Sequence, residues 1–164
     1  TEQKMAEMER RETEDRLQMV VDNVPAIVCL KNREGQYQLI NEAFEAHTGI
    51  RADNVIGSLD SEIFSEDIAT PFIETDKKVM ESNQGIQLEE RAPHPDGTLH
   101  DYWASKIPIT NELDQVSGIL AVSLDITERK KMEKQLLKAK EDAERRELAS
   151  IHWTLSVSHA NPTQ

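Results

Sequence analysis

Histidines and carboxylates gather around one short turn of the sequence. His94 and His100 flank a Pro-Asp-Gly turn at 95–97, and Asp96 and Asp101 lie beside them. The two histidines can face each other across a hairpin, and imidazole and carboxylate groups are ligands for divalent metals. Two histidines are few for a metal site, since zinc sites use three or four protein ligands. We therefore expect a solvated hairpin tip and no metal site.

The other reactive side chains form no recognisable active site. His47 shares the apolar face of a predicted helix with Phe44, which favours a packed imidazole over a metal or haem ligand. The single cysteine, Cys29, excludes an internal disulfide and any zinc or iron–sulfur site built from several cysteines. No carboxylate pair, nucleophile elbow or phosphate-cradling glycine loop stands out. We expect this stretch of chain to have no enzymatic activity of its own.

The charge balance excludes several classes of partner. The 164 residues include 19 Lys and Arg against 31 Asp and Glu, a formal net charge of -12. Surfaces that bind nucleic acid or acidic lipid are basic, so we expect neither partner. No apolar run approaches the ~20 residues of a membrane-spanning helix, so we expect no membrane contact. The sequence begins at Thr1 without a basic-then-apolar leader, and we expect a cytoplasmic piece of a longer protein.

Two charged helices are predicted to flank a central region. Residues 1–21 lack Pro and Gly and favour a helix that is too polar to bury much surface alone. Residues 127–150 contain an apolar seam with spacings of four, three and four, which is typical of a two-stranded coiled coil. The seam consists of Met132, Leu136, Ala139 and Ala143. We expect a homodimer through the flanking helices; the alternative is a single amphipathic helix packed on its own domain.

The central region, residues 22–126, begins with a predicted β-hairpin and a helix. Residues 26–30 and 36–40 are strand candidates separated by turn residues. Asn41 fits the N-cap of the following helix, because its side-chain oxygen can accept a free backbone N–H. Gly49 fits the C-terminal stop of that helix.

A longer helix and three strands complete the central region. Thr70-Pro71 indicates the start of the helix, with the threonine as cap, and Gly85 indicates its end. The three strands are predicted at 86–92, 99–109 and 116–126. Short hairpin connections imply antiparallel pairing, and the intervening helices can cover one face of the sheet. The sequence therefore predicts an α+β fold.

The order of these elements resembles a PAS domain with its C-terminal PAC half. The matching segments are Val24-Pro25, Gly35, Ile40-Asn41-Glu42-Ala43-Phe44, Thr48-Gly49, Val55-Ile56-Gly57, Pro95-Asp96-Gly97, Trp103, Ser105, Pro108-Ile109, Gly118 and Asp125-Ile126-Thr127-Glu128-Arg129. The last segment, followed by a charged helix, is the most specific. The resemblance implies a five-stranded antiparallel sheet with helices on one face, enclosing a small-ligand site. It also implies a cytosolic sensory input that dimerises through flanking helices.

The resemblance implies a ligand pocket on the sheet and the helices that cover it. Its candidate residues are Cys29, Tyr37, Asn41, Phe44, Ile56, Phe72, Met80, Trp103, Ser105 and Leu120. Light–oxygen–voltage flavin photosensors resemble this fold but need a reactive Cys in the helix after Gly57, and residues 58–64 contain none. Haem-binding relatives supply a His from the longest helix, and residues 71–84 contain none. A non-covalent flavin, a small metabolite and an empty domain remain as alternatives.

The exit from the central region contains a candidate signal relay. Asp125 closes the last strand, and Thr127 can cap the outgoing helix. A polar hinge between a sheet and a coiled coil can convert movement of the sheet into rotation of the helix. The alternative is that these residues only end a strand and begin a helix.

The tail, residues 151–164, contains a weak candidate for phosphoryl chemistry. The segment 155–159 resembles the phospho-acceptor box of sensor histidine kinases, in which His159 would attack the γ-phosphoryl group of ATP. The Glu and Arg expected after this histidine are missing. We expect a sensory domain that relays a ligand or redox signal to a downstream output such as a histidine kinase. A diguanylate cyclase or other output and a ligand-free dimerisation module are the alternatives.

Overall fold

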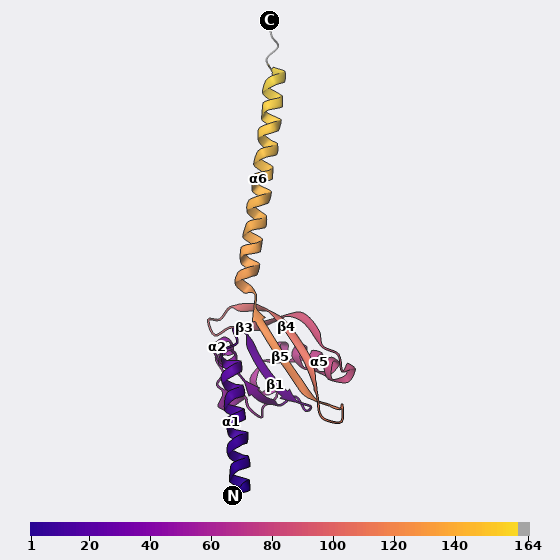
Figure 1. Ribbon diagram of the computed structural model, residues 1–164. Helices are drawn as coiled ribbons and strands as arrows, with labels where there is room; N and C mark the ends of the chain where they lie inside the picture. Colours follow the sequence, from indigo (N-terminus) through magenta and orange to yellow (C-terminus); the bar gives the residue numbers. More distant parts are fainter. Residues whose placement is uncertain (161–164) are drawn as a thin grey trace. The chain divides into compact units, whose positions relative to one another are not determined.

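The structure is a computed structural model that describes residues 1–160 and divides into two units. The first unit, residues 1–126, contains one sheet and the helices that surround it (Figure 1). The second unit begins at Thr127 and contains the helix α6 (Thr127–Ala160). The predicted α+β class is confirmed.

The sheet has five strands, all paired antiparallel with their neighbours. They are β1 (Ile27–Asn32), β2 (Tyr37–Ile40), β3 (Ile86–Pro93), β4 (Leu99–Thr110) and β5 (Val116–Asp125). Their spatial order is β2-β1-β5-β4-β3, so the first and last strands of the sequence pair at the centre (Figure 1). The five-stranded antiparallel sheet implied by the resemblance is therefore confirmed.

The pairing of β1 with β5 depends on a glycine. Gly118 lies opposite Asn32, and a Cβ atom on it would come within 2.2 Å of the carbonyl oxygen of Lys31. Any larger residue would push the two strands apart at this point. Lys31, whose carbonyl makes this close approach, is a buried residue of β1.

The covered face of the sheet is fixed by the pleat of β4. Tyr102, Ala104 and Lys106 are buried, at 3% or less of full exposure. Trp103 and Ile107 alternate with them and are 39% and 48% exposed. Successive side chains of a strand point to opposite faces, so the even-numbered positions of β4 face the helices and the odd-numbered ones face away.

Five helices belong to the first unit. They are α1 (Glu2–Asp22), α2 (Glu42–Thr48), α3 (Ala52–Val55), α4 (Asp60–Ile63) and α5 (Glu66–Ser82). Helix α2 packs on β1, and α5 packs on β3, β4 and β5. The end of α1 joins the edge strand β2, because the side-chain amide of Gln18 donates to the carbonyl of Ile40 at 2.9 Å.

Asn41 begins α2, and its predicted role as the N-cap is confirmed. Its Oδ1 atom accepts from the backbone N–H groups of Phe44 and Val28, at 3.1 and 2.9 Å. Its Nδ2 atom donates to the carbonyls of Val21 and Ala26, at 2.9 and 2.8 Å. This buried amide therefore joins the end of α1, the start of β1 and the start of α2.

Helix α5 begins earlier than the sequence predicted. Its first residue is Glu66, so Pro71 lies inside the helix rather than at its first position. The cost of the missing N–H is offset because α5 buries Ala69 and Val79 and carries acidic residues in its first turn. Asn83, in the left-handed conformation, ends the helix two residues before Gly85.

Helix α6 extends past the predicted boundary at residue 150 and reaches Ala160. The apolar seam ends at Ala143, but no Pro or Gly interrupts residues 127–160. A helix continues through residues of good propensity whether or not a seam accompanies them. Residues 151–160 are thus continuous with the predicted signalling helix, and residues 161–164 of the predicted tail lie outside the described residues.

Candidate functional site

A cavity of about 70 Å³ lies between the covered face of the sheet and helices α2 and α5. All five strands contribute to its wall. The volume accommodates several water molecules or a small polar ligand. Four of the predicted pocket residues line the cavity: Cys29, Tyr37, Phe44 and Phe72.

Three predicted pocket residues on β4 and β5 lie outside the cavity. Trp103, Ser105 and Leu120 alternate along their strands with residues that line the cavity or face it. The pleat therefore turns these three side chains to the opposite face of the sheet. Their apolar or small side chains gave no indication of which face they would occupy.

The remaining predicted pocket residues also have other positions. Asn41 is engaged as the cap of α2. Ile56 lies in a shallow groove beside α1 and is 47% exposed. Met80 lines a separate groove at the end of α5, together with Leu59.

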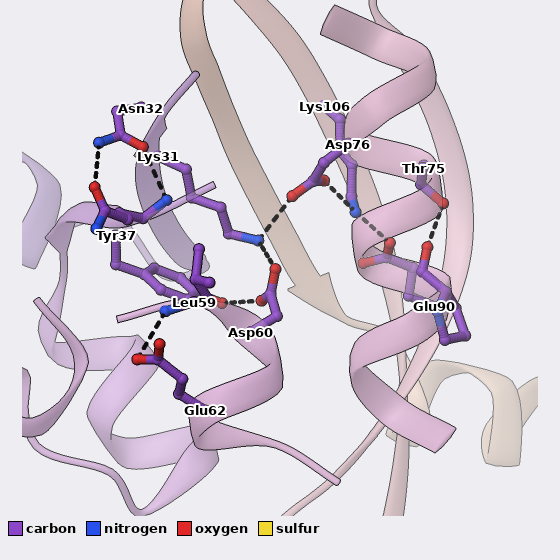
Figure 2. Close-up of polar contacts among 12 residues, drawn as sticks. Lys31, Asn32, Tyr37, Leu59, Asp60, Glu62, Thr75, Asp76, Glu90 and Lys106 are labelled. Carbon is purple, nitrogen blue, oxygen red and sulfur yellow. Dashed lines mark hydrogen bonds and ion pairs between the residues drawn. The ribbon is translucent and has the colours of Figure 1, made fainter. Parts of the chain in front are cut away.

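Five ionisable side chains beside the cavity form a network that we name the buried charge cluster (Figure 2). They are Lys31, Asp60, Asp76, Glu90 and Lys106. The ammonium of Lys31 lies 2.5 Å from Asp60 Oδ2 and 2.7 Å from Asp76 Oδ2. The ammonium of Lys106 lies 2.8 Å from Asp76 Oδ1 and 2.7 Å from Glu90 Oε1. These side chains are only 3% to 11% exposed, so the charges are shielded from water.

The buried charge cluster has more acceptors than donors. Its two lysines and three carboxylates give a formal charge of -1, and the hydroxyl of Tyr37 donates to Asp60 Oδ1 at 2.6 Å. Glu90 Oε1 is close to Lys106 but lacks a partner with hydrogen-bond geometry among residues 1–160. Because Glu90 lines the cavity, a donor placed there can approach its carboxylate.

Burial and neighbouring charges fix the protonation states in this region. Burial disfavours the charged form of Lys31, but Asp76 and Asp60 outweigh this effect and raise its pKa above the ordinary value. Burial, together with nearby Cys29 and Asp60, raises the pKa of Tyr37 well above its usual range. Burial also raises the pKa of the Cys29 thiol to about 11. At neutral pH Lys31 is therefore charged, and Cys29 and Tyr37 are protonated.

None of the five members of the buried charge cluster was predicted from the sequence. One signal was present in the sequence. Cys29 and Ala104 are small or apolar residues of predicted strands, and Lys31 and Lys106 each follow one of them by two residues, which is the spacing of side chains on the same face of a strand. A lysine at a strand position that faces the core implies a buried carboxylate partner. The carboxylate partners lie 29 and 45 residues from Lys31, and 30 and 16 residues from Lys106, so only the fold brings them together.

The candidate relay residue Asp125 ends β5 and makes polar contacts near the rim of the cavity. Its Oδ2 atom lies 2.7 Å from His100 Nδ1 and 3.6 Å from His47 Nδ1. Burial lowers the pKa of His47, although Asp125 opposes that shift. Ile126 and then Thr127, the first residue of α6, follow Asp125 directly in the chain.

Helix α6 exposes its apolar seam in the single chain. Met132 and Leu136 are 67% and 72% exposed. The weak phospho-acceptor candidate, His159, is exposed in the last turn, and its Nδ1 atom lies 3.1 Å from the carbonyl oxygen of Leu155. Across residues 1–160, every helix is too short or too polar to cross a membrane.

Comparison with known proteins assigns the fold to a family. Residues 21–131 match the model of the PAS fold. The chain belongs to the PAS family. The solved structure of the PAS domain of BvgS from Bordetella pertussis superimposes with a TM-score of 0.62 at 21% identity, covering 80% of this chain and 98% of that one. The cavity and the buried charge cluster therefore lie in the interior of a PAS domain.

Two curated relatives of this PAS domain are a sensor protein and a diguanylate cyclase. The aerobic respiration control sensor protein ArcB of Escherichia coli is 28% identical over 126 residues, which are 77% of this chain and 16% of ArcB. A diguanylate cyclase of Vibrio cholerae is 29% identical over 121 residues, which are 73% of this chain and 38% of the cyclase. The chain thus spans 16% and 38% of the length of these two relatives.

Proposed function

We propose that this PAS domain senses a small polar ligand that donates a hydrogen bond to Glu90. The observation that supports this proposal is the Glu90 carboxylate at the wall of the cavity, whose Oε1 atom is ion-paired with Lys106 but lacks a partner with hydrogen-bond geometry among residues 1–160. A neutral donor or a cation satisfies that carboxylate, whereas an anion is repelled. The small cavity favours a metabolite over a flavin, since ligands of that size occupy larger pockets.

Lys106 offers a route from the ligand to the fold. It holds Glu90 on β3 and Asp76 on α5 at the same time. A donor group of the ligand at Glu90 competes with the ammonium of Lys106 for the carboxylate. Lys106 then interacts more with Asp76, which changes the ion-pair contact between the sheet and α5. A redox signal read by Cys29 has less support, because the thiol is buried and protonated.

The relay would pass through Asp125 and Thr127 to α6, in a cytoplasmic homodimer joined by its helices. The exposure of Met132 and Leu136 supports a coiled-coil partner for the seam. Because a regulatory histidine kinase of Methanothrix harundinacea is 29% identical to this chain over 126 residues, a histidine kinase is the favoured output. The Vibrio cholerae relative supports a diguanylate cyclase as the second candidate.

Native mass spectrometry of the gently purified chain tests ligand binding. We compare wild type with Glu90→Gln, which keeps the shape of the side chain but removes its charge. Glu89→Gln is the matched control, since Glu89 is the exposed neighbour on the same strand. We expect an adduct mass on wild type and on Glu89→Gln that is lost from Glu90→Gln. Equal adducts on all three proteins would contradict the assignment of Glu90, and clean dimer masses throughout would favour the ligand-free dimerisation module.

A further inference from the structure

Three histidines from separate segments meet at the rim of the cavity. His47 lies on α2, His94 follows β3, and His100 lies on β4. Each histidine offers one ring nitrogen as a possible metal ligand, and these three nitrogen atoms all lie within 4.8 Å of one another. The side chains are 18% to 27% exposed, so solvent reaches this histidine cluster.

Packing of the β3–β4 hairpin against the end of α2 creates the histidine cluster. Gly49 ends α2 at a φ of +74°, and a Cβ atom there would approach Pro95 Cγ to 3.3 Å. The hairpin tip is thereby held against α2, which places the rings of His94 and His47 5.5 Å apart. Across the hairpin, the rings of His94 and His100 stack with their centroids 4.1 Å apart.

Hydrogen bonds engage one nitrogen of each ring in the histidine cluster, and the Nδ1 atom of His94 accepts from the backbone N–H of Asp96 at 3.4 Å. Asp125 can only accept, so His100 Nδ1 carries a proton and its Nε2 atom holds the lone pair in the neutral ring. His47 Nδ1 lies 3.1 Å from the hydroxyl oxygen of Tyr102. In the tautomer in which Nδ1 donates to that oxygen, the Nε2 atom of His47 holds the lone pair. Histidines that bind metals commonly donate their other ring N–H to a carboxylate, as His100 does here.

A carboxylate completes the donor set. Asp96 Oδ1 lies 3.4 Å from His94 Nδ1, and Asp96 Oδ2 lies 3.8 Å from His100 Nε2. The backbone N–H and the hydroxyl of Thr98 donate to Asp96 Oδ1 at 2.9 and 2.6 Å. These bonds fix Asp96 in the turn beside the two imidazoles.

We propose that His47, His94 and His100 bind one divalent transition-metal ion of the Zn²⁺ class, with Asp96 as the fourth ligand. Imidazole suits zinc and its neighbours in the first transition row, and three histidines with one further ligand form a tetrahedral site. A cation also matches the acidity of this end of the domain, where Asp96 and Asp125 lie against the histidine cluster. The third histidine, 47 residues before His94, is the ligand that the sequence pattern did not indicate.

Metal binding requires a small rearrangement of the rings. Zinc–nitrogen bonds of about 2.1 Å bring the ligand atoms of a tetrahedral site to roughly 3.4 Å from one another, closer than the 4.8 Å limit seen here. The parallel rings of His94 and His100 must also turn so that both lone pairs point to one ion. His94 has room to turn because it lies in the hairpin connection and is 25% exposed.

Titration of the tag-free, chelator-stripped 164-residue chain with Zn²⁺ tests the proposal, with calorimetry as the readout. We expect one ion per chain. We expect at least ~10-fold weaker binding in each of the variants His47→Ala, His94→Ala and His100→Ala. Loss of a residue that only hydrogen-bonds a metal ligand already costs about 10–100-fold in affinity, and loss of a ligand should cost no less. His152→Ala is the matched control, because His152 is exposed on α6, and it should bind as wild type does.

Two further measurements guard against misfolding of the variants. Circular dichroism and thermal melting without metal establish that each variant is folded. In wild type, histidine ring NMR signals should shift with Zn²⁺ for the three cluster residues and not for His152 or His159. Absence of stoichiometric binding, affinity unchanged in the three variants, or shifts confined to His152 and His159 would each overturn the metal site.

Discussion

Removing the cation of Lys31 should strongly destabilise the domain. In Lys31→Met the aliphatic stem remains, but Asp60 and Asp76 lose an ammonium at 2.5 and 2.7 Å while their side chains stay 3% to 6% exposed. Breaking a buried ion pair from one side costs about 3–5 kcal/mol. That cost lowers the ratio of folded to unfolded protein by between two and four powers of ten, roughly. It is a large part of the ~5–15 kcal/mol that stabilises a typical domain.

Urea denaturation at neutral pH measures this loss of unfolding free energy. Lys77→Met is the matched control, because the ammonium of Lys77 lies 3.8 Å from Glu81 and both side chains are more than 60% exposed. An exposed pair contributes about 0–1 kcal/mol, so the control should remain near wild type. Combining Lys31→Met with Asp60→Asn and Asp76→Asn should restore part of the lost unfolding free energy, because the two carboxylate charges that Lys31 compensated are then also removed. A cost for Lys31→Met no greater than that of Lys77→Met would refute this view of the buried charge cluster.

Four other predictions follow from the same structure. Because the pKa of Cys29 is raised to about 11, a disulfide reagent at pH 8 should label the thiol only after unfolding. Gly118→Ala places a Cβ atom 2.2 Å from a backbone oxygen and should lower the unfolding free energy by at least about 1–3 kcal/mol in urea. The buried ion pairs raise the pKa of Lys31 in the folded state, so their contribution to stability is complete below the unfolded-state pKa of 10.5. This contribution is lost as the pH rises through the folded-state pKa of Lys31. The stability gap between wild type and Lys31→Met should therefore shrink above pH 10.5, and a constant gap would count against the pairing. In sedimentation, Leu136→Lys in the seam should yield monomers, whereas Leu137→Lys beside the seam should not.

The sequence predicted the sheet well because its turn signals are local. Hairpin residues separate strands of clear alternation, and Asn41 has the side chain that an N-cap needs. The start of α5 was wrong because Thr70-Pro71 satisfies local rules for a helix start, while packing on the sheet stabilises a helix that begins at Glu66. Local rules therefore succeed where a turn or cap decides the structure and fail where tertiary packing decides it.

The interior of the cavity was harder to predict, for a different physical reason. Lys31 and Lys106 are charged residues, which the sequence alone places on the surface. Their burial depends on carboxylates from α4, α5 and β3, and those partners are identified only once the strand register and helix positions are known. The same applies to His47, which joins the other two histidines only because the hairpin tip packs on Gly49.

A thermal-shift screen tests whether Glu90 recognises a ligand. Wild type, Glu90→Gln and the control Glu89→Gln are melted with a panel of small polar metabolites that includes cationic, neutral and anionic members. We predict that at least one cationic or neutral donor raises the melting temperature of wild type and of Glu89→Gln but not that of Glu90→Gln. Stabilisation by anions alone, or equal stabilisation of all three proteins, would contradict the account.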